Sequence, residues 1–135
     1  MTAPVYLDVS AIVKIVLREV GSPELIDFLA GRSDRVSSVI AAVEAPRAIL
    51  RREPGAAASV AALIEGLDLV RLDAAIVRRA ASLPPTVVRS LDAIHIASAM
   101  AIGDIDAFIT YDERQAEAAR MLGLPVVAPG EGDLP

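Results

Sequence analysis

The chain has 135 residues, of which 13 are basic and 18 acidic, so its formal net charge is −5. This length fits one domain with a substantial core, and the negative charge argues against a protein that binds nucleic acid through overall charge alone. Cysteine is absent, which excludes disulfides and thiolate metal sites. No apolar run approaches the roughly 20 residues that cross a bilayer, and the N-terminus lacks a signal-peptide pattern. We therefore expect a cytoplasmic protein that does not bind membranes.

The first half of the chain alternates short apolar strands with helices. The expected elements, in chain order, are a strand over 4–8, a helix begun by Ser10, a helix over 22–31, a strand over 35–39, a helix over 40–53 and an Ala-rich helix ending near Gly66. Ser10 and Ser22 are expected to cap the helices that they begin. Pro46 lies inside the helix over 40–53 and is expected to kink it, because proline removes a backbone hydrogen bond.

The second half continues the same alternation. The expected elements are a strand over 68–72, a helix over 73–81, a loop over 82–86, a helix from Ser90 to Gly103, a strand over 106–110, a helix over 112–123, a strand over 125–129 and a Gly/Asp/Pro tail from about 130. Ser90 is a good N-cap residue, and Gly103 is placed to end the helix that Ser90 begins.

Strands that alternate with helices predict an α/β fold, with a mainly parallel sheet of about five strands covered by helices on both faces. No linker or repeat divides the sequence, so we expect one domain over residues 1–135. Ligands of such sheets bind at the carboxyl ends of the strands, where the strand order reverses. Acidic residues at that edge are therefore candidates for a functional site.

Two acidic residues follow predicted strands and so fall on this edge. Asp8 closes the first strand, and Asp112 lies just past the strand over 106–110. Aspartate is also a common turn former, so either residue alone could be purely structural. The coincidence of two acids at one edge favours a shared role.

Two further acids lie on helices among apolar neighbours. Glu44 is near the apolar side of its helix, where an unpaired charge is costly, and an ion pair with Arg47 is the alternative explanation. Asp92 is in the first turn of its helix, where an acid gains about 0.3 to 1 kcal/mol from the helix dipole. Four converging carboxylates would repel one another unless a cation compensated them, and oxygen ligands suit Mg²⁺ or Mn²⁺.

Four segments, in this order along the chain, strongly resemble the PIN-domain ribonucleases, and most closely the VapC-type toxins of type II toxin–antitoxin systems. The segments are YLDVSAIVK, SSVIAAVEAPRAILRR, RSLDAIHIASA and FITYDERQAEAARMLGLPVVAP. The resemblance covers nearly the whole chain. It implies a PIN-like fold and a metal-dependent endoribonuclease that cleaves RNA phosphodiester bonds with metal-activated water, is inhibited by a cognate antitoxin and forms a homodimer.

The resemblance also assigns roles to individual residues. The four acids of the family motif match Asp8, Glu44, Asp92 and Asp112, which are therefore expected to be catalytic and to bind Mg²⁺ or Mn²⁺. Ser10 and Thr110 match the small hydroxyl residues that support these acids in the family. His95, the only histidine, could be a base or a ligand, but we expect a hydrogen-bonded structural residue and leave it out of the site.

Three other functions are less consistent with the sequence. A phosphotransferase of the haloacid dehalogenase kind needs a second Asp two residues after Asp8, where this chain has Ser10. A receiver domain needs a lysine at a strand end, but Lys14, the only lysine, lies within a predicted helix. A PIN-fold interaction module that had lost its activity should have lost acids, and all four are present.

The basic and aromatic residues limit how the chain could hold RNA. Arginines at 47, 51 and 52 could form a local phosphate-binding face, although an exposed helix face explains them better. The chain has only two tyrosines, two phenylalanines and no tryptophan, too few for a base-stacking platform. We therefore expect contacts to RNA to be mostly contacts to phosphate.

Overall fold

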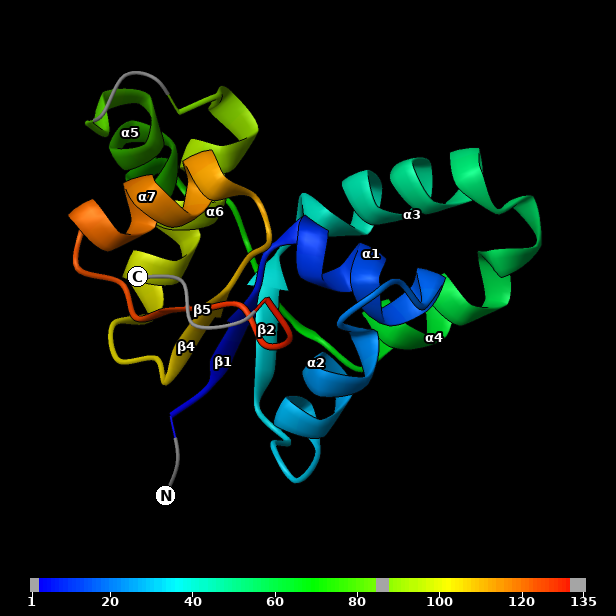
Figure 1. Cartoon of the computed structure of the whole chain (residues 1–135). Helices are drawn as coiled ribbons and strands as arrows, with labels where there is room; N and C mark the ends of the chain where they lie inside the picture. Colours follow the sequence, from blue (N-terminus) through cyan, green and yellow to red (C-terminus); the bar gives the residue numbers. More distant parts are fainter. Residues whose placement is uncertain (1–2, 85–87, 132–135) are drawn as a thin grey trace.

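The structure, a computed structural model, describes residues 3–84 and 88–131. Its centre is a five-stranded sheet in which every strand pair is parallel, in the order β3-β2-β1-β4-β5 (Figure 1). The strands are β1 Val5–Leu7, β2 Arg35–Ser38, β3 Asp68–Val70, β4 Ala107–Ile109 and β5 Val126–Val127. The predicted parallel α/β sheet of about five strands is confirmed.

Helices cover both faces of this sheet. They are α1 Val9–Leu17, α2 Ser22–Leu29, α3 Ala41–Arg52, the 3₁₀ turn η1 Pro54–Ala56, α4 Ala57–Glu65, α5 Ala74–Ser82, α6 Ser90–Ile102 and α7 Glu113–Met121. Side chains alternate across a strand, so Val5 and Leu7 pack with α1 to α4 while Tyr6 packs with α6 and α7. Helix α5 lies outside α6 (Figure 1). None of the helices in the described part of the chain is long and apolar enough to span a membrane.

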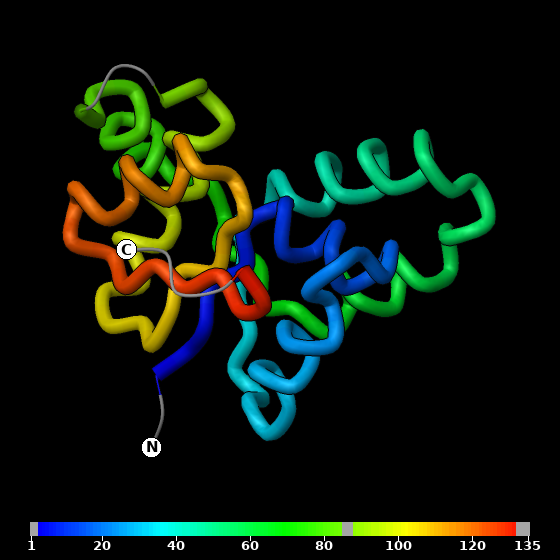
Figure 2. The backbone as a smooth tube through the Cα atoms, in the orientation of Figure 1, coloured from blue at the N-terminus to red at the C-terminus, as the bar shows by residue number. Residues whose placement is uncertain are grey.

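The strand order reverses direction at β1. The chain builds β1, β2 and β3 outward in one direction, then returns to add β4 and β5 on the other side of β1, as the trace in Figure 2 shows. Registers Tyr6↔Val36 and Tyr6↔Phe108 bring the three central strands level. A topological switch point therefore lies at the carboxyl ends of β1 and β4, where open parallel sheets bind ligands.

The three predicted serine N-caps were wrong. The N-cap positions of α1, α2 and α6 are held by other residues without side-chain cap bonds, namely Asp8, Gly21 and Arg89. Ser22 and Ser90 are each the first residue of their helix, and Ser10 is the second residue of α1. Asp92 nevertheless remains in the first turn of α6.

The hydroxyl groups of two of these serines have tertiary partners instead. Ser22 Oγ donates to the carbonyl of Lys14 at 2.6 Å, which ties α2 to α1. Ser10 Oγ donates to Asp8 Oδ2 at 3.1 Å and accepts from the Tyr111 backbone N–H at 2.9 Å. Both serine hydroxyls therefore form hydrogen bonds between segments instead of capping a helix.

Helix α3 continues through Pro46, as one element from Ala41 to Arg52. The proline removes the hydrogen bond to the Ala42 carbonyl without ending the helix. The strand predicted over 68–72 ends earlier, at Val70. Residues 85–86 of the predicted loop and residues 132–135 of the predicted tail lie outside the described residues.

Candidate acidic site at the sheet switch point

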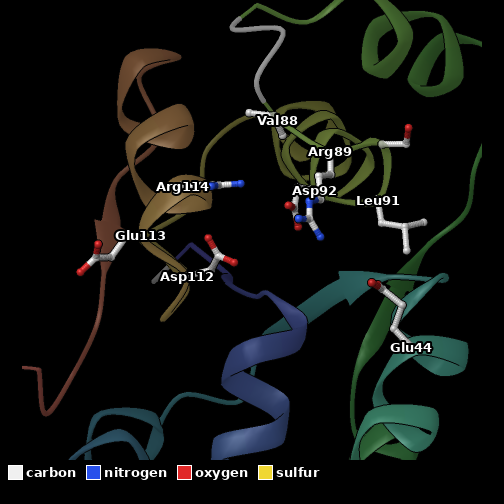
Figure 3. Close-up of a pocket in the computed structure, with 9 residues that line it drawn as sticks. Glu44, Val88, Arg89, Leu91, Asp92, Asp112, Glu113 and Arg114 are labelled. Atoms are coloured by element: carbon white, nitrogen blue, oxygen red, sulfur yellow. The ribbon is translucent and has the colours of Figure 1, made fainter.

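A pocket of about 860 Å³ opens at the carboxyl ends of the central strands (Figure 3). Three of the four predicted acids line it, each from a different element: Glu44 from α3, Asp92 from the first turn of α6 and Asp112 from the start of α7. Asp8, at the end of β1, is buried beside them, and its charge acts on Asp92. The fold thus brings together four acids that lie far apart in the sequence.

The two carboxylate oxygens of Asp8 have different surroundings. Oδ2 accepts hydrogen bonds from Thr110 Oγ1 at 2.7 Å and from Ser10 Oγ at 3.1 Å. Oδ1 has no hydrogen-bond partner among the described residues. It is nevertheless buried, because the whole residue is only 1% exposed. An ionised oxygen without a partner is costly to bury, so this atom is suited to contact a cation.

Glu44 is held by a buried chain of hydrogen bonds. Its Oε1 lies 2.7 Å from His95 Nε2, and His95 Nδ1 lies 2.7 Å from the Tyr6 hydroxyl. Burial raises the pKa of Tyr6 well above its usual value, so the hydroxyl keeps its proton and is able to donate a hydrogen bond to Nδ1. In the tautomer in which Nδ1 accepts from Tyr6, Nε2 carries the proton and donates to Glu44.

His95 links two of the acids. Its side chain is fully buried, and its Nε2 also lies 3.9 Å from the unpartnered Asp8 Oδ1. The alternative partner for Glu44, Arg47, makes no ion pair with it in the described part of the chain. His95 is hydrogen-bonded and buried as expected, but it also contacts the site, which its sequence context alone did not predict. The signal was its position one helical turn after Asp92.

The carboxylate of Asp92 is destabilised by its surroundings. Burial, together with the charges of Asp8 and Asp112, raises its pKa to about 6. Its main-chain carbonyl accepts a hydrogen bond from Gln115 Nε2 at 3.1 Å, which ties the start of α6 to α7. Gln115 is fully buried, and no sequence motif pointed to it. A bound cation would relieve the repulsion that raises the Asp92 pKa.

Asp112 serves both the fold and the pocket. Its Oδ1 caps α7 by accepting from the Gln115 backbone N–H at 3.0 Å, and its own N–H donates to Thr110 Oγ1 at 3.2 Å. Its second carboxylate oxygen has no hydrogen-bond partner within the described ranges. Asp106, a nearby acid in the sequence, lies before β4 and pairs with Arg32 at 3.4 Å. Asp112 is thus the acid at the carboxyl end of this strand.

These side chains fit a divalent cation. The donors are all oxygens, one buried Asp8 oxygen has no partner in the described part of the chain, and the pKa of Asp92 is raised first by burial and then by the charges of Asp8 and Asp112. Within residues 3–84 and 88–131, no three acidic or histidine side chains already lie close enough together to hold one ion. Binding would therefore require the acids to turn inward toward the ion.

The fold and the pocket define an α/β protein with an all-oxygen acidic site at its topological switch point. Residues 5–121 match the PIN domain family. Ribonuclease VapC46 of Mycobacterium tuberculosis is 42% identical over 128 residues, which cover 94% of this chain and 98% of the relative. Ribonuclease VapC35 of the same species is 41% identical over 132 residues, covering 94% and 98%. The chain therefore belongs to the PIN domain family, as its motifs indicated.

Solved structures show the same fold. The crystal structure of M. tuberculosis VapC20, described as a Sarcin-Ricin loop cleaving toxin, superposes with a TM-score of 0.75 at 16% identity, covering 93% of this chain and 99% of that one. VapBC2 from Rickettsia felis, bound to a DNA fragment from its promoter, gives a TM-score of 0.70 at 12% identity, covering 93% and 98%.

Proposed function

We propose that the protein is a metal-dependent endoribonuclease, the toxin of a type II toxin–antitoxin pair. The observation that carries the proposal is the buried Asp8 oxygen without a partner among the described residues, beside an acidic pocket at the switch point. The relatives named Ribonuclease VapC, aligned over 94% of the chain, support the choice of RNA as substrate.

In this proposal Asp8, Glu44, Asp92 and Asp112 hold Mg²⁺ or Mn²⁺. When bound, such an ion polarises a phosphoryl oxygen and lowers the pKa of water, so that water can cleave a phosphodiester. The chain orients the acids beforehand. Ser10 and Thr110 fix one oxygen of Asp8 and leave the other free, while His95 fixes Glu44.

The proposal includes the partners and setting of a VapC-type toxin. A cognate antitoxin would restrain the enzyme by covering the acidic pocket, and two copies of the chain would form a homodimer. Because its substrate is RNA, the active protein would work in the cytoplasm. We take residues 1–135 as one domain, because β5 lies beyond the matched residues 5–121 yet pairs with β4.

Cleavage of RNA by the purified protein tests this function. Cleavage should require Mg²⁺ or Mn²⁺ and stop with a chelator, and Asp92→Asn should lower the rate about 100-fold or more because it removes a ligand charge. Asp104→Asn, in the exposed loop before β4, is the matched control and should leave the rate unchanged. Equal cleavage by the Asp92→Asn variant and the wild type would contradict the assignment.

Sequencing of RNA ends after brief induction in cells would identify the target together with the activity. New ends should appear within minutes in wild-type cultures and be absent from Asp92→Asn cultures. A wild-type protein that binds its antitoxin tightly but produces no new ends, in cells or in vitro, would favour the inactive interaction module instead.

A further inference from the structure

Two arginines line the acidic pocket on the side of α6 and α7. Arg89 occupies the N-cap position of α6, and Arg114 is the second residue of α7. Figure 3 shows Arg114 directed from α7 toward the start of α6, while Glu113 points away from the other carboxylates. The arginine-rich end of α3, the other candidate phosphate-binding face, contributes no arginine to this lining.

Neither pocket arginine is engaged by the part of the chain that the structure describes. Among the described residues, Arg89 and Arg114 make no side-chain hydrogen bond and no ion pair, although four acids line the same pocket. Three other arginines do make such bonds, for example Arg32 with Asp106 at 3.4 Å and Arg35 with the Leu29 carbonyl at 2.9 Å. Arg89 and Arg114 are the arginines that line the acidic pocket in the described part of the chain. Two exposed guanidinium groups at the rim are therefore available to an external anion.

We infer that Arg89 and Arg114 anchor RNA phosphates on the α6 and α7 side of the pocket, and so place the bond to be cut over the acids. This inference rests on the proposed nuclease function and adds the groups that hold the substrate. A guanidinium donates two parallel hydrogen bonds to phosphate oxygens, a geometry that lysine cannot reproduce.

Electrostatics explains why anchors are needed at this rim. A nucleic acid approaching a pocket lined by Glu44, Asp92 and Asp112 is repelled unless positive groups stand beside the acids. Helix α6 also begins here without a side-chain cap, so its free N–H groups add to the positive potential. The arginines supply the charge that the chain as a whole, at −5, does not.

The pocket offers phosphate contacts but no stacking contacts. Its lining among the described residues contains no aromatic side chain. Base stacking on aromatic rings is the usual sequence-tolerant grip on single strands, and it is missing here. In this inference the described lining holds RNA through its phosphates rather than by base stacking.

Steady-state cleavage of an RNA substrate at several salt concentrations tests the inference. Arg89→Gln and Arg114→Gln should each raise KM about tenfold and leave kcat within about twofold, because binding then lacks a charge-assisted hydrogen bond. The slope of log(kcat/KM) against log[salt] should fall by about 0.7 for each single-strand phosphate that the variant no longer holds. Arg78→Gln, on the exposed face of α5 outside the pocket, is the control and should change neither quantity.

Lysine variants separate charge from geometry. Arg114→Lys should keep the salt slope, because the charge remains, yet recover only part of the KM. Unchanged KM and slope in both glutamine variants would overturn the inference while leaving the nuclease function intact. A fall in kcat without a change in KM would also overturn it, because the arginines would then act on the reaction rather than on binding.

Binding measured without cleavage separates this inference from the proposed function. Fluorescence anisotropy of a labelled single-stranded RNA, with Ca²⁺ in place of Mg²⁺, should show weaker and less salt-dependent binding by both glutamine variants. That result supports the anchors even if the wild type never cleaves the RNA. Wild-type protein that does not bind RNA at all would overturn the anchors and the nuclease together. Thermal melts of all variants should match the wild type, because both side chains are exposed.

Discussion

Asp8 shows how one residue can be both fixed and reactive. Two hydroxyl groups, from Ser10 and Thr110, hold Oδ2 and thereby set the direction of Oδ1, which has no partner in the described part of the chain. The hydroxyl of Thr110 also accepts the Asp112 backbone N–H at 3.2 Å. A single threonine thus positions two of the acids.

Thr110→Val removes this hydroxyl and keeps the shape of the side chain. We expect the free energy of unfolding to fall by about 1 to 3 kcal/mol, because a buried carboxylate oxygen is deprived of its shorter hydrogen bond. We also expect a 10- to 100-fold weaker apparent affinity for Mg²⁺ in cleavage, roughly the range typical for residues that orient metal ligands. Urea denaturation and a Mg²⁺ titration of activity measure these effects. Thr110→Ser should retain most of the stability and most of the apparent Mg²⁺ affinity. A Thr110→Val variant with wild-type Mg²⁺ dependence would contradict the orienting role.

Asp92 links the site to stability. Its pKa in the folded, metal-free protein is about 6, above the ordinary aspartate value of 3.8, so the folded state binds the proton more tightly than the unfolded chain. Ionisation therefore destabilises the fold above pH 6, and this destabilisation disappears as the pH falls from about 6 to 4.

Asp92→Asn should remove that destabilisation. In the metal-free protein at pH 8 the variant should be more stable by about 1 kcal/mol, a value that allows for solvent screening of a partly exposed group. At pH 4 the two proteins should be equally stable. Chemical denaturation with a chelator present checks both points, with Asp104→Asn as a control that shifts neither. A variant less stable than the wild type at pH 8 would show that Asp92 is a structural helix-start acid.

At the scale of elements, the chain Tyr6–His95–Glu44 joins β1, α6 and α3. Tyr6 also stacks on Phe108, with ring centroids 5.1 Å apart, so its ring and its hydroxyl have separate roles. The ring packs the sheet against the helices. The hydroxyl makes a 2.7 Å hydrogen bond to His95 Nδ1, on the opposite side of the imidazole from Glu44.

Tyr6→Phe isolates the second role, because phenylalanine keeps the stacked ring. We expect stability to fall by about 1 kcal/mol and kcat to fall roughly tenfold without a change in KM for RNA, since Glu44 no longer has a fixed donor. Tyr111→Phe is the matched control, because it removes a similar 2.7 Å bond, to the Pro129 carbonyl. It should cost stability alone. Equal effects of the two variants on kcat would mean that His95 does not position Glu44.

The pattern of the sequence predicted the elements well because each depends on local spacing. Apolar runs placed the strands, and glycine ended α6 at Gly103, where φ is 91°. The predicted serine N-caps were wrong because residue spacing contains no information about tertiary contacts. Ser10 and Ser22 instead form hydrogen bonds with segments packed beside them.

The residues of the site also fall into two groups, those that the sequence predicted and those that it did not. Motif order identified the acids, but the contact between His95 and Tyr6 joins residues 89 positions apart, and no local pattern reports it. The buried Gln115, which connects α7 to Asp92, was missed for the same reason. Whether the four acids bind metal together is still a prediction.

At the scale of the whole molecule, the negative charge of the acidic pocket can attract two kinds of cation, a metal ion and a basic side chain of a partner. A metal ion can occupy it, and so can a basic side chain of an antitoxin, which could bind two carboxylates at once. Metal and antitoxin should therefore compete.

Raising Mg²⁺ or Mn²⁺ should weaken the complex with the cognate antitoxin, and Asp8→Asn combined with Asp92→Asn should weaken it further than Arg78→Ala, a change outside the pocket. Calorimetric titration of the antitoxin into each protein, at several metal concentrations, measures this. An affinity that responds neither to metal nor to the two acids would place inhibition elsewhere on the surface.

The switch-point topology also determines at which point of synthesis the acidic pocket can form. The pocket needs Asp8 from the end of the first strand and Asp112 from the start of the last helix, and domains emerge from the ribosome N-terminal end first. A nascent chain that already contains Glu44 still lacks the wall formed by α6 and α7. The acidic pocket is therefore incomplete until α7 has emerged, and any restraint by a partner has only to act from that moment.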